Sequence, residues 1–509
     1  MPVAKAESLL SQNRFRFLNK EREIVSKSEW NNPSLEKLWL YNLHYFDFLN
    51  SGHGPNRTLT CSEIINRWIT ENPPFEGVGW EPYPTSRRIV NWIKWAWSGG
   101  HLWKEAINSL FLQAMYLTKR LEWHLLGNHL LANAKALIYA GLFFDGQEPE
   151  IWLRKGISIF LREIDEQILG DGGHFERSPM YHAIVLEDVL DVINALKYSG
   201  NLNFGPAKSL YDKCLEIAPR MLFWLGVMTH PDGKPVLFND STFDGAASKS
   251  DLESYASKLG IEVKNGTAAK YINEDYIKIT HLKETGYIRV DWDKKSAFLD
   301  VAPLGPDYLL GHGHADTLTF ELSDSSERII VDTGVSTYEP NMERQRQRST
   351  AAHNTVVVNE QDSSEVWAAF RVGRRAYPFG LSIVKKKDGS ILIECQHTGY
   401  ERLNGRPIHK RQWRFLKGGF IVKDTVIGRF KRATAFLHFH PSFRLNSTGL
   451  RSIEAICGSK KGILIEVTKG EPQIINTTWH PEFGSAVESR GIQVQLKGNE
   501  CEVGFFFRE

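Results

Sequence analysis

The sequence predicts an α+β multidomain protein, in which an N-terminal array of paired helices, closed or partly closed, precedes a C-terminal antiparallel β-sandwich. Apolar residues recur with a helical period of about 3.6 between residues 33 and 226, and with a period of about 2 after residue 280. The length of 509 residues, with 42% hydrophobic and 24% charged residues, is sufficient for two to four globular domains with large cores.

The helical half is divided by turn signals such as Ser98-Gly99-Gly100 and Asp171-Gly172-Gly173. Between these signals the apolar stripes predict helices near 34–50, 61–72, 84–97, 104–122, 128–143, 151–168, 181–199 and 207–226. Because the connections are short, consecutive helices are expected to pair as antiparallel hairpins. This pattern favours an α/α array over a four-helix bundle.

The C-terminal half alternates apolar and polar residues, as in Ile288/Val290/Trp292 and Ile492/Val494/Leu496, with frequent Gly, Asn and Asp between short runs. This pattern predicts many short antiparallel strands in stacked sheets. Residues 229–280 read as a connector with one short helical pattern. We therefore expect an extension over 1–32, a helical domain with its connector over 33–280, and a β-sandwich domain over 281–509.

Composition excludes several classes of protein. The 62 Lys and Arg against 60 Asp and Glu give a net charge of +2, which argues against a nucleic-acid binder. No apolar run is long enough to span a membrane. The five cysteines are scattered without a CxxC spacing, so neither a disulfide framework nor a cysteine zinc site is expected. The N-terminus shows no apolar signal-peptide core, so a signal peptide is either absent or has been removed. The location therefore stays open: we expect a cytoplasmic protein in the first case and a periplasmic or secreted one in the second.

The densest polar cluster in the sequence contains two histidines, His312 and His314, separated by one glycine. On an extended segment these side chains project to the same side. Asp332 and His353 follow on neighbouring strands and complete a His/Asp/His set that suits Zn²⁺ with one open position. We expect the metal ligands to be His314, Asp332 and His353; the alternative is that these are hydrogen-bonded strand residues.

Two predicted helices begin with polar side chains. Asn128 and His129 open one helix, where Asn128 can act as the cap. Tyr181 and His182 open another, and in an α/α array such helix ends line the central cavity. A tyrosine beside imidazoles can serve as an acid or base, although a buried structural tyrosine is the alternative.

Aromatic residues make up 12% of the chain, and rings with polar tips are common in carbohydrate-binding clefts. One segment joins Trp80 and Tyr83 to Arg87 and Arg88, which can bind carboxylate or sulfate groups. A second basic run, Arg344, Arg346 and Arg348, is followed by Arg371, Arg374 and Arg375. Substrate binding and a solvated surface are equally good interpretations of these arginines.

The order of Asn128-His129, Tyr181, His312-x-His314, Asp332 and His353-Asn354 resembles the heparinase II/III-like polysaccharide lyases over about residues 35–450. This resemblance implies an incomplete (α/α) toroid followed by an antiparallel β-sandwich. It also implies an enzyme that cleaves uronic-acid polysaccharides by β-elimination.

The resemblance further implies roles for individual residues. Asn128 would bind the uronate carboxylate and His312 would help to stabilise the developing enolate. Tyr181 would protonate the leaving oxygen and act as base on its own side of the ring, whereas His129 would be the base for the opposite C5 epimer. His314, Asp332 and His353 would hold a structural Zn²⁺. The expected substrate-binding residues are Trp80, Tyr83, Arg87, Arg88, His182, Arg348 and Arg371.

The expected function is therefore that of a lyase acting on an acidic polysaccharide, with glycosaminoglycans such as hyaluronan, chondroitin sulfate and heparan sulfate as leading substrates. Three alternatives remain open at this point. The chain could be a lyase for alginate or a bacterial exopolysaccharide or capsule, a toroid glycoside hydrolase, or a non-catalytic glycan-binding protein.

Overall fold

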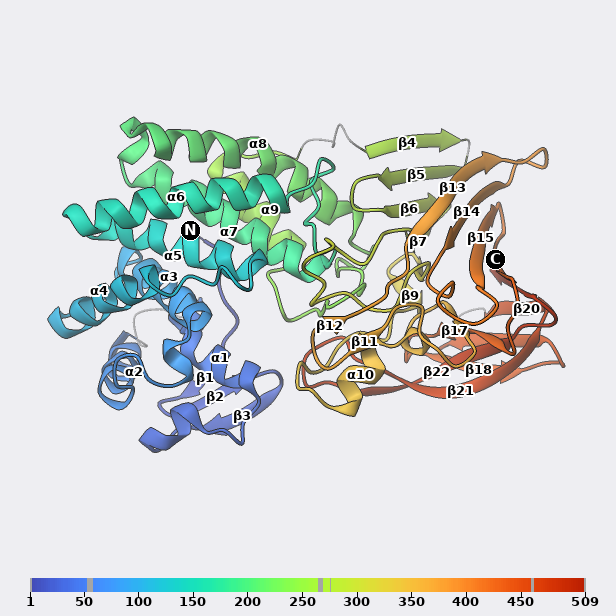
Figure 1. The fold of residues 1–509 in the computed structure, drawn as a ribbon, viewed down its shortest axis with the longest axis horizontal. Helices are drawn as coiled ribbons and strands as arrows, with labels where there is room; N and C mark the ends of the chain where they lie inside the picture. The colour runs from blue at the N-terminus through green and yellow to red at the C-terminus, as the bar shows by residue number, and fades with distance from the viewer. Residues whose placement is uncertain (1, 53–57, 264–268, 275, 459–461, 508–509) are drawn as a thin grey trace. The chain divides into compact units, whose positions relative to one another are not determined.

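The structure is a computed structural model that describes residues 2–52, 58–263, 269–274, 276–458 and 462–507. The chain forms two compact units, each built from three segments. Unit 1 comprises Met1–Ile168, Ala183–Leu222 and Ser250–Lys264, and unit 2 comprises Leu169–His182, Phe223–Lys249 and Asn265–Glu509. Figure 1 shows that helices dominate the first half of the chain and strands the second, which confirms the predicted fold class.

Unit 1 is an array of helices at the positions that the apolar period predicts. The α-helices of the described chain up to residue 259 are α1 (Lys37–Tyr45), α2 (Thr58–Glu71), α3 (Pro82–Trp97), α4 (Lys104–Thr118), α5 (Gly127–Phe143), α6 (Gln147–Gln167), α7 (Pro179–Tyr198), α8 (Gly205–Val227) and α9 (Lys249–Leu259). The short turns η1 (Lys27–Asn31), η2 (Asp47–Asn50), η4 (Val78–Trp80) and η5 (Asn201–Asn203) lie between them. All eight predicted helices are confirmed, with α1 and η2 together covering the first.

The predicted extension over 1–32 contains a small sheet that the sequence interpretation missed. Its strands are β1 (Leu9–Ser11), β2 (Arg14–Phe17) and β3 (Lys20–Glu23). The turn between β2 and β3 places Leu18 and Asn19 at positive φ, as a tight hairpin turn requires. The pattern was missed because strands of three or four residues are too short for a clear alternation.

The packing of α5 against α6 forms the centre of unit 1. Most of α5 is buried, including Leu130, Leu131, Leu137 and Ile138. The two helices approach closely because α6 carries Gly156, where a Cβ atom would lie 2.8 Å from a backbone oxygen of α5. A larger residue would force the helices apart, so the backbone itself forms part of this interface.

Unit 2 consists mainly of antiparallel sheets. A six-stranded meander runs in order through β4 (Ala269–Glu274), β5 (Ile277–Leu282), β6 (Tyr287–Trp292), β7 (Lys295–Asp300), β8 (Phe320–Asp324) and β9 (Glu327–Ile330). An eight-stranded sheet has the order β13 (Pro378–Lys385), β14 (Ile391–His397), β15 (Ile408–Leu416), β16 (Gly419–Ile427), β23 (Glu500–Phe507), β20 (Ile463–Lys469), β19 (Ser452–Cys457) and β18 (Phe443–Ser447).

Two smaller sheets and two short helical segments complete unit 2. A four-stranded sheet has the order β10 (Val356–Val358), β17 (Ala433–His438), β22 (Val487–Gln495) and β21 (Glu471–Trp479). Strands β11 (Val366–Trp367) and β12 (Arg371–Val372) form a hairpin. Helix α10 (Met342–Arg348) and the turn η6 (Thr350–Ala352) precede β10.

The core of unit 2 lies between stacked sheets. Burial alternates along β15, so that Trp413 and Phe415 point inward while Lys410 and Gln412 lie on the outer face. Trp292 from the six-stranded meander meets the Phe415 ring edge to face at a centroid distance of 5.0 Å. The period-2 pattern thus produced the expected sandwich core.

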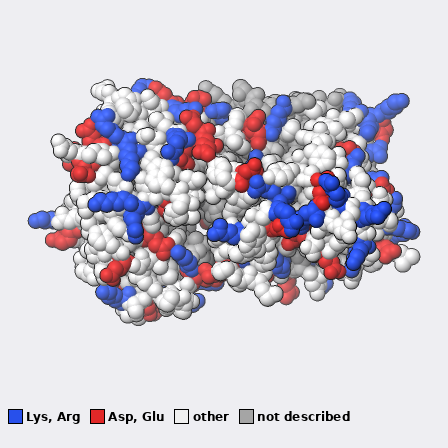
Figure 2. All heavy atoms as spheres, in the orientation of Figure 1, with Lys and Arg blue, Asp and Glu red and all other residues white. Residues whose placement is uncertain are grey.

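The composition-based expectations agree with the structure. Acidic and basic side chains are interspersed over the face shown in Figure 2, as the near-zero net charge suggests. The five cysteines are free thiols, and four of them are buried. Within the described ranges, none of the helices combines the length and hydropathy that a bilayer-spanning helix requires.

Candidate active site

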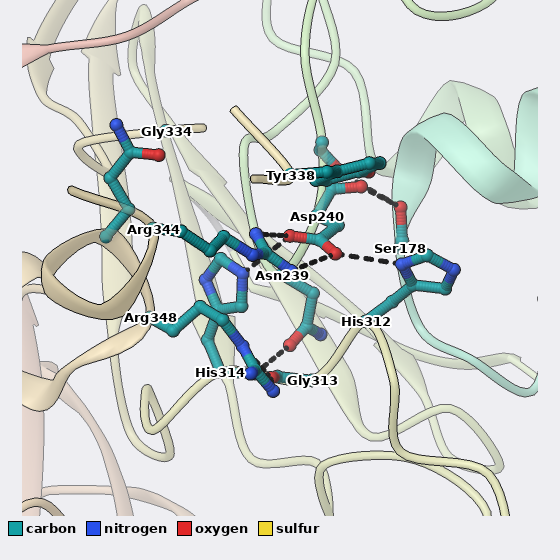
Figure 3. A network of polar contacts seen from close by, with 12 residues as sticks. Ser178, Asn239, Asp240, His312, Gly313, His314, Gly334, Tyr338, Arg344 and Arg348 are labelled. Atoms are coloured by element: carbon teal, nitrogen blue, oxygen red, sulfur yellow. Dashed lines mark hydrogen bonds and ion pairs between the residues drawn. The ribbon is translucent and has the colours of Figure 1, made fainter. Parts of the chain in front are cut away.

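Asp240 is the centre of a buried polar network in unit 2. One carboxylate oxygen accepts a hydrogen bond from Nδ1 of His312, and the other accepts one from Nε2 of His314, each at 2.8 Å. The Arg344 guanidinium donates to both oxygens, with Nη2 at 2.7 Å from Oδ2. Figure 3 shows these three side chains converging on Asp240. A single carboxylate therefore fixes two histidines.

The ion pair keeps Asp240 charged. Burial alone would raise the pKa of the Asp240 carboxyl, but the Arg344 guanidinium and the hydrogen bonds from His312 and His314 hold it well below its usual range. Because an ionised carboxylate can only accept hydrogen bonds, each histidine must donate its bonded N–H. The bond also fixes the His312 ring, whose side chain is 15% exposed.

Tyr181 lies directly against His312. The two rings stack at a centroid distance of 3.9 Å and an interplanar angle of 30°. The Tyr181 hydroxyl is also 3.3 Å from the hydroxyl of Tyr338, whose ring lies beneath the Arg344 guanidinium at 4.8 Å. The structure thus brings together Tyr181 and His312, which are 131 positions apart by their numbers, with a second tyrosine hydroxyl.

The start of α7 positions Tyr181. Pro179 occupies the first position of the helix, where its missing N–H costs no hydrogen bond. The Ser178 hydroxyl accepts a hydrogen bond from the Tyr181 amide at 3.1 Å and donates one to the Asp240 carbonyl at 2.6 Å. The helix end that carries Tyr181 is therefore tied to the segment that carries Asp240.

The loop that carries His312 and His314 is held from both sides. The Asn239 side chain accepts a hydrogen bond from the His314 amide at 3.0 Å. The Arg348 guanidinium donates to the Gly313 carbonyl, with Nη2 at 2.9 Å. Burial lowers the pKa of Arg348 to about 10, and its side chain is fully enclosed. Arg348, predicted to bind substrate, is instead placed to support the His312 loop.

The three candidate zinc ligands are buried, and each histidine donates one N–H to a carboxylate. His314 donates through Nε2 to Asp240, and His353 donates through Nδ1 to Asp332 at 2.7 Å. Among the residues that the structure describes, the remaining nitrogens, Nδ1 of His314 and Nε2 of His353, have no hydrogen-bond partner. His314 has the arrangement common to metal-binding histidines, in which the second nitrogen donates to a carboxylate outside the ligand set, whereas the partner of His353 is Asp332, itself a candidate ligand. A buried imidazole nitrogen is a type of ligand that binds Zn²⁺, although no three His, Cys, Asp or Glu residues in the described ranges are gathered as a metal site.

In unit 1, Asn128 and His129 lie in the first turn of α5. The structure corrects the expected capping role of Asn128, because the helix begins at Gly127 and its cap is Leu126, without a side-chain hydrogen bond. Nδ1 of His129 lies 3.0 Å from the Glu122 carboxylate, and its ring is 4.5 Å from the ring of Tyr83. Glu122 thus orients His129 as Asp240 orients His312.

Two of the predicted substrate-binding residues are in the core of unit 1. Arg88 is fully buried, donates to Gln113 at 2.9 Å and to the Gly79 carbonyl at 2.8 Å, and stacks over Trp68 at 3.8 Å. Trp80 is 3% exposed and packs against Trp68 at 5.8 Å. We therefore revise the role of Arg88 and Trp80 from substrate binding to packing.

The other predicted binding residues differ in exposure. His182 is fully buried, accepts a hydrogen bond from the His174 amide at 3.2 Å and packs on Trp224, so its role is also structural. Arg87 is half-buried and lies 3.4 Å from Asp47. Tyr83 is half-buried, and burial raises its pKa to about 12. Arg371, on β12, is exposed.

The sequence interpretation missed the parts played by Asp240, Tyr338 and Arg344. Asp240 lies in the polar stretch that was read as a connector, 72 residues before His312. The basic run that contains Arg344 suggests an exposed or substrate-binding surface, but Arg344 and Arg348 are buried on the inner face of α10. The spacing of four residues between Arg344 and Arg348 is the signal in the sequence that places both side chains on one face of a helix.

Two family models match the chain. Heparinase II/III N-terminus matches residues 101–259, and Heparinase II/III-like, C-terminal matches residues 278–504. A heparin-sulfate lyase of Bacteroides stercoris is 25% identical over 334 residues, which are 62% of this chain and 45% of that protein. A heparin-sulfate lyase of Pedobacter heparinus is 27% identical over 275 residues, which are 51% and 40% of the two chains.

The match spans about half the length of these curated relatives. Among solved structures, a crystal structure of heparinase III superposes with a TM-score of 0.71 at 17% identity, covering 96% of this chain and 79% of the other. At this identity the likeness concerns the fold, and it supports a helical toroid followed by a β-sandwich.

Proposed function

Because the chain belongs to the heparinase II/III-like family, we propose that it is a polysaccharide lyase that cleaves uronic-acid-containing glycosaminoglycans by β-elimination. The observation that carries this proposal is the contact of Tyr181 with both His312 and Tyr338. The names of the relatives add heparan sulfate as the first substrate to test. Hyaluronan, chondroitin sulfate and alginate complete the set.

The proposed reaction removes the proton on C5 of a uronate and expels the oxygen on C4, leaving a C4–C5 double bond. The C5 proton is weakly acidic, so the carboxylate next to it must be stabilised as negative charge develops. Imidazole and amide N–H groups supply such stabilisation. The reaction also needs one group that takes the C5 proton and one that gives a proton to the leaving oxygen.

Tyr181 is the proposed acid, and the base for a C5 proton on its own side of the ring. Its hydroxyl lies 3.3 Å from that of Tyr338, so a proton can pass between the two oxygens during the cycle. His312 lies against the Tyr181 ring and is the proposed donor to the developing enolate. Its Nδ1–H is donated to Asp240, so the proposed donation from Nε2 to the substrate requires His312 as the imidazolium, which carries a proton on both ring nitrogens.

From the family resemblance, Asn128 is proposed to bind a uronate carboxylate and His129 to be the base for the opposite C5 epimer. Support for His129 comes from its contact with Glu122, since a carboxylate on Nδ1 fixes the ring and stabilises the imidazolium that proton abstraction produces. Support for Asn128 comes from its place in the same first turn of α5 and from the family resemblance of the motif.

We also propose a structural Zn²⁺ held by His314, Asp332 and His353. Nδ1 of His314 and Nε2 of His353, both buried and without a hydrogen-bond partner in the described part of the chain, support this proposal. When bound, the ion would supply charge that ties the segments around residues 314, 332 and 353 together. Protein side chains, and not the ion, carry out all the proton transfers proposed above.

The test of the lyase proposal is incubation with heparan sulfate, hyaluronan, chondroitin sulfate and alginate, followed by ultraviolet absorbance. Elimination creates a conjugated unsaturated uronate that absorbs, whereas hydrolysis gives reducing ends without this absorbance. Tyr181→Phe is expected to reduce turnover by about 10²- to 10⁴-fold with an unchanged circular dichroism spectrum. Ser250→Ala, on the helix α9, is a control that should leave turnover unchanged.

Three outcomes contradict the proposal. If no uronate polymer gives new absorbance with zinc supplied, the lyase proposal is refuted. New reducing ends without absorbance would indicate a glycoside hydrolase. Full activity of the Tyr181→Phe variant would remove Tyr181 from the mechanism.

A further inference from the structure

The hairpin formed by β11 and β12, here called the 366–372 hairpin, presents an aromatic ring and a guanidinium side by side. Trp367 and Arg371 are directly opposite each other in the antiparallel ladder, so their side chains lie on the same face. Val366, on the other face, is buried. Trp367 is 50% exposed.

Helix α10 supports the hairpin through side-chain to backbone hydrogen bonds. Arg344 donates from Nε to the Ala369 carbonyl at 3.0 Å, and Gln345 donates to the Val366 carbonyl at 2.7 Å. Arg348 donates to the Ala368 carbonyl at 3.3 Å. These donors hold the hairpin backbone from the side of α10, and Trp367 and Arg371 stay exposed to solvent. Figure 1 shows β11, β12 and α10 close together.

The tip of the hairpin touches the candidate active site. Phe370 packs edge to face against His312 at a centroid distance of 5.8 Å and against Tyr338 at 5.3 Å. The Arg344 guanidinium, which binds Asp240, also lies over the Phe370 ring at 5.4 Å. Trp367 and Arg371 therefore flank, in the chain, a residue that contacts the side chains proposed to carry out the reaction.

Charges around the hairpin leave Arg371 available. Glu365 is occupied by Arg374, whose Nε lies 3.0 Å from the carboxylate, and Asp307 is occupied by Arg375 at 2.8 Å. Within the part of the chain that the structure describes, Arg371 makes no ion pair. An exposed, unpaired guanidinium beside a ring can fork onto an anionic group of a sugar whose apolar face lies on the ring.

We propose that the 366–372 hairpin is a sugar-binding subsite, in which Trp367 stacks on a pyranose adjacent to the cleaved bond and Arg371 binds the carboxylate or sulfate of that chain. This inference rests on the proposed function, since it takes the occupant to be the acidic polysaccharide. It assigns to Arg371 the recognition of charge that the near-neutral protein does not supply over its whole surface, and to Trp367 the contact with the sugar ring.

Binding is measured without turnover, by calorimetry of defined oligosaccharides with the Tyr181→Phe protein. Trp367→Ala, Arg371→Ala and Arg371→Lys are compared in this background. Hyaluronan oligosaccharides carry carboxylates only and heparan sulfate oligosaccharides carry both groups, so the two ligands separate the sources of the anion. Tyr198→Ala and Arg406→Ala, at exposed residues of other elements, are matched controls.

We expect Arg371→Ala to weaken binding roughly tenfold and Trp367→Ala about three- to tenfold, with the controls within about twofold of the parent. Arg371→Lys should recover part of the loss, because it keeps the charge but not the fork. With active protein, the same variants should raise KM for the polymer and leave kcat nearly unchanged.

The inference and the lyase proposal fail in different ways. If the parent binds acidic oligosaccharides and both alanine variants bind equally well, the subsite is wrong whatever the activity. If binding falls as expected but no unsaturated product forms with wild-type protein, the subsite stands and the lyase proposal fails. If the parent binds no acidic oligosaccharide at all, both are overturned.

Discussion

Asp240 accepts a hydrogen bond from Nδ1 of His312 at 2.8 Å, although 72 residues separate them in the chain. The other oxygen of the same carboxylate binds His314, one of the proposed zinc ligands. The orientation of His312 therefore depends on a residue outside its own motif, and on the buried Arg344 that neutralises Asp240.

Asp240→Asn should damage both stability and turnover. The substitution leaves the Arg344 cation buried without a counter-charge, which typically costs about 3–5 kcal/mol. It also loosens His312, and we expect kcat to fall by about tenfold or more. Denaturant unfolding and steady-state kinetics measure the two effects.

Arg344→Met in the Asp240→Asn background distinguishes an orphaned charge from a general packing defect. Removing the unpaired cation should recover part of the lost free energy of unfolding. Simple addition of the two single effects would contradict the ion pair as the source of the loss.

Tyr338→Phe should lower kcat by about five- to tenfold, because it removes one hydrogen bond to the Tyr181 hydroxyl. The ring contacts with Phe370 and Phe483 do not involve the hydroxyl and should persist. KM and the melting temperature are expected to change little. A variant with wild-type kcat would show that Tyr181 works without its partner.

Arg88→Met should affect stability and not substrate affinity. The variant removes the Arg88 donor from the Gln113 oxygen, a loss of roughly 1–3 kcal/mol for a buried group left unsatisfied. The Gly79 carbonyl also loses its bond from Arg88 but keeps the one from the Thr85 hydroxyl at 3.3 Å. KM measured on folded protein should match that of the wild type. A large rise in KM without loss of stability would restore Arg88 to the substrate-binding residues.

Glu321→Gln should flatten the dependence of stability on pH. Burial raises the pKa of Glu321 to about 8 from an ordinary value of 4.5, although Arg328 lowers it. Between these two pH values the folded protein keeps the proton on the Glu321 carboxyl, whereas the unfolded chain releases it. The contribution of Glu321 to the free energy of unfolding is therefore complete below pH 4.5 and is lost as pH rises through about 8.

The slope for one such group is at most about 1.4 kcal/mol per pH unit. Unfolding of wild type and Glu321→Gln between pH 5 and 9 measures the difference, and the exposed Glu471→Gln is the control. Parallel curves for wild type and Glu321→Gln would assign the pH dependence to other groups.

The purified protein should contain one zinc ion per chain, and chelation should lower the melting temperature by about 4 °C or more. His353→Ala should lower it as well and should abolish the further effect of the chelator. Elemental analysis and thermal unfolding test this. Well-folded protein that lacks zinc and is insensitive to chelators would refute the site.

Periodicity in the sequence was enough to predict the helices of unit 1 and the sheets of unit 2, because each element buries one repeating face. It was not enough to predict which polar residues are buried. Trp80, Arg88 and His182 looked like binding residues, but each packs among side chains distant in sequence. Local pattern does not reveal which partners a polar group will find.

The sequence predicts only part of the candidate site, because local motifs do not reveal contacts between residues distant in the chain. The resemblance depended on short motifs, and Tyr181 and His312 do lie in contact. Asp240 and Tyr338 are not marked by any local pattern, because their importance comes from contacts across long stretches of chain. Only the folded protein shows that the carboxylate of a supposed connector holds the His312 ring.

The two compact units cannot be separated by one cut of the chain. A fragment that starts at Ala269, where the strands of unit 2 begin, would include His312, Tyr338 and the 366–372 hairpin. It would lack Tyr181 and Asp240, which unit 2 draws from two earlier segments. Expression of the β half alone would thus give a scaffold without its proposed acid, and restoring it would require the missing segments to be supplied as a second polypeptide or spliced on by a new linker.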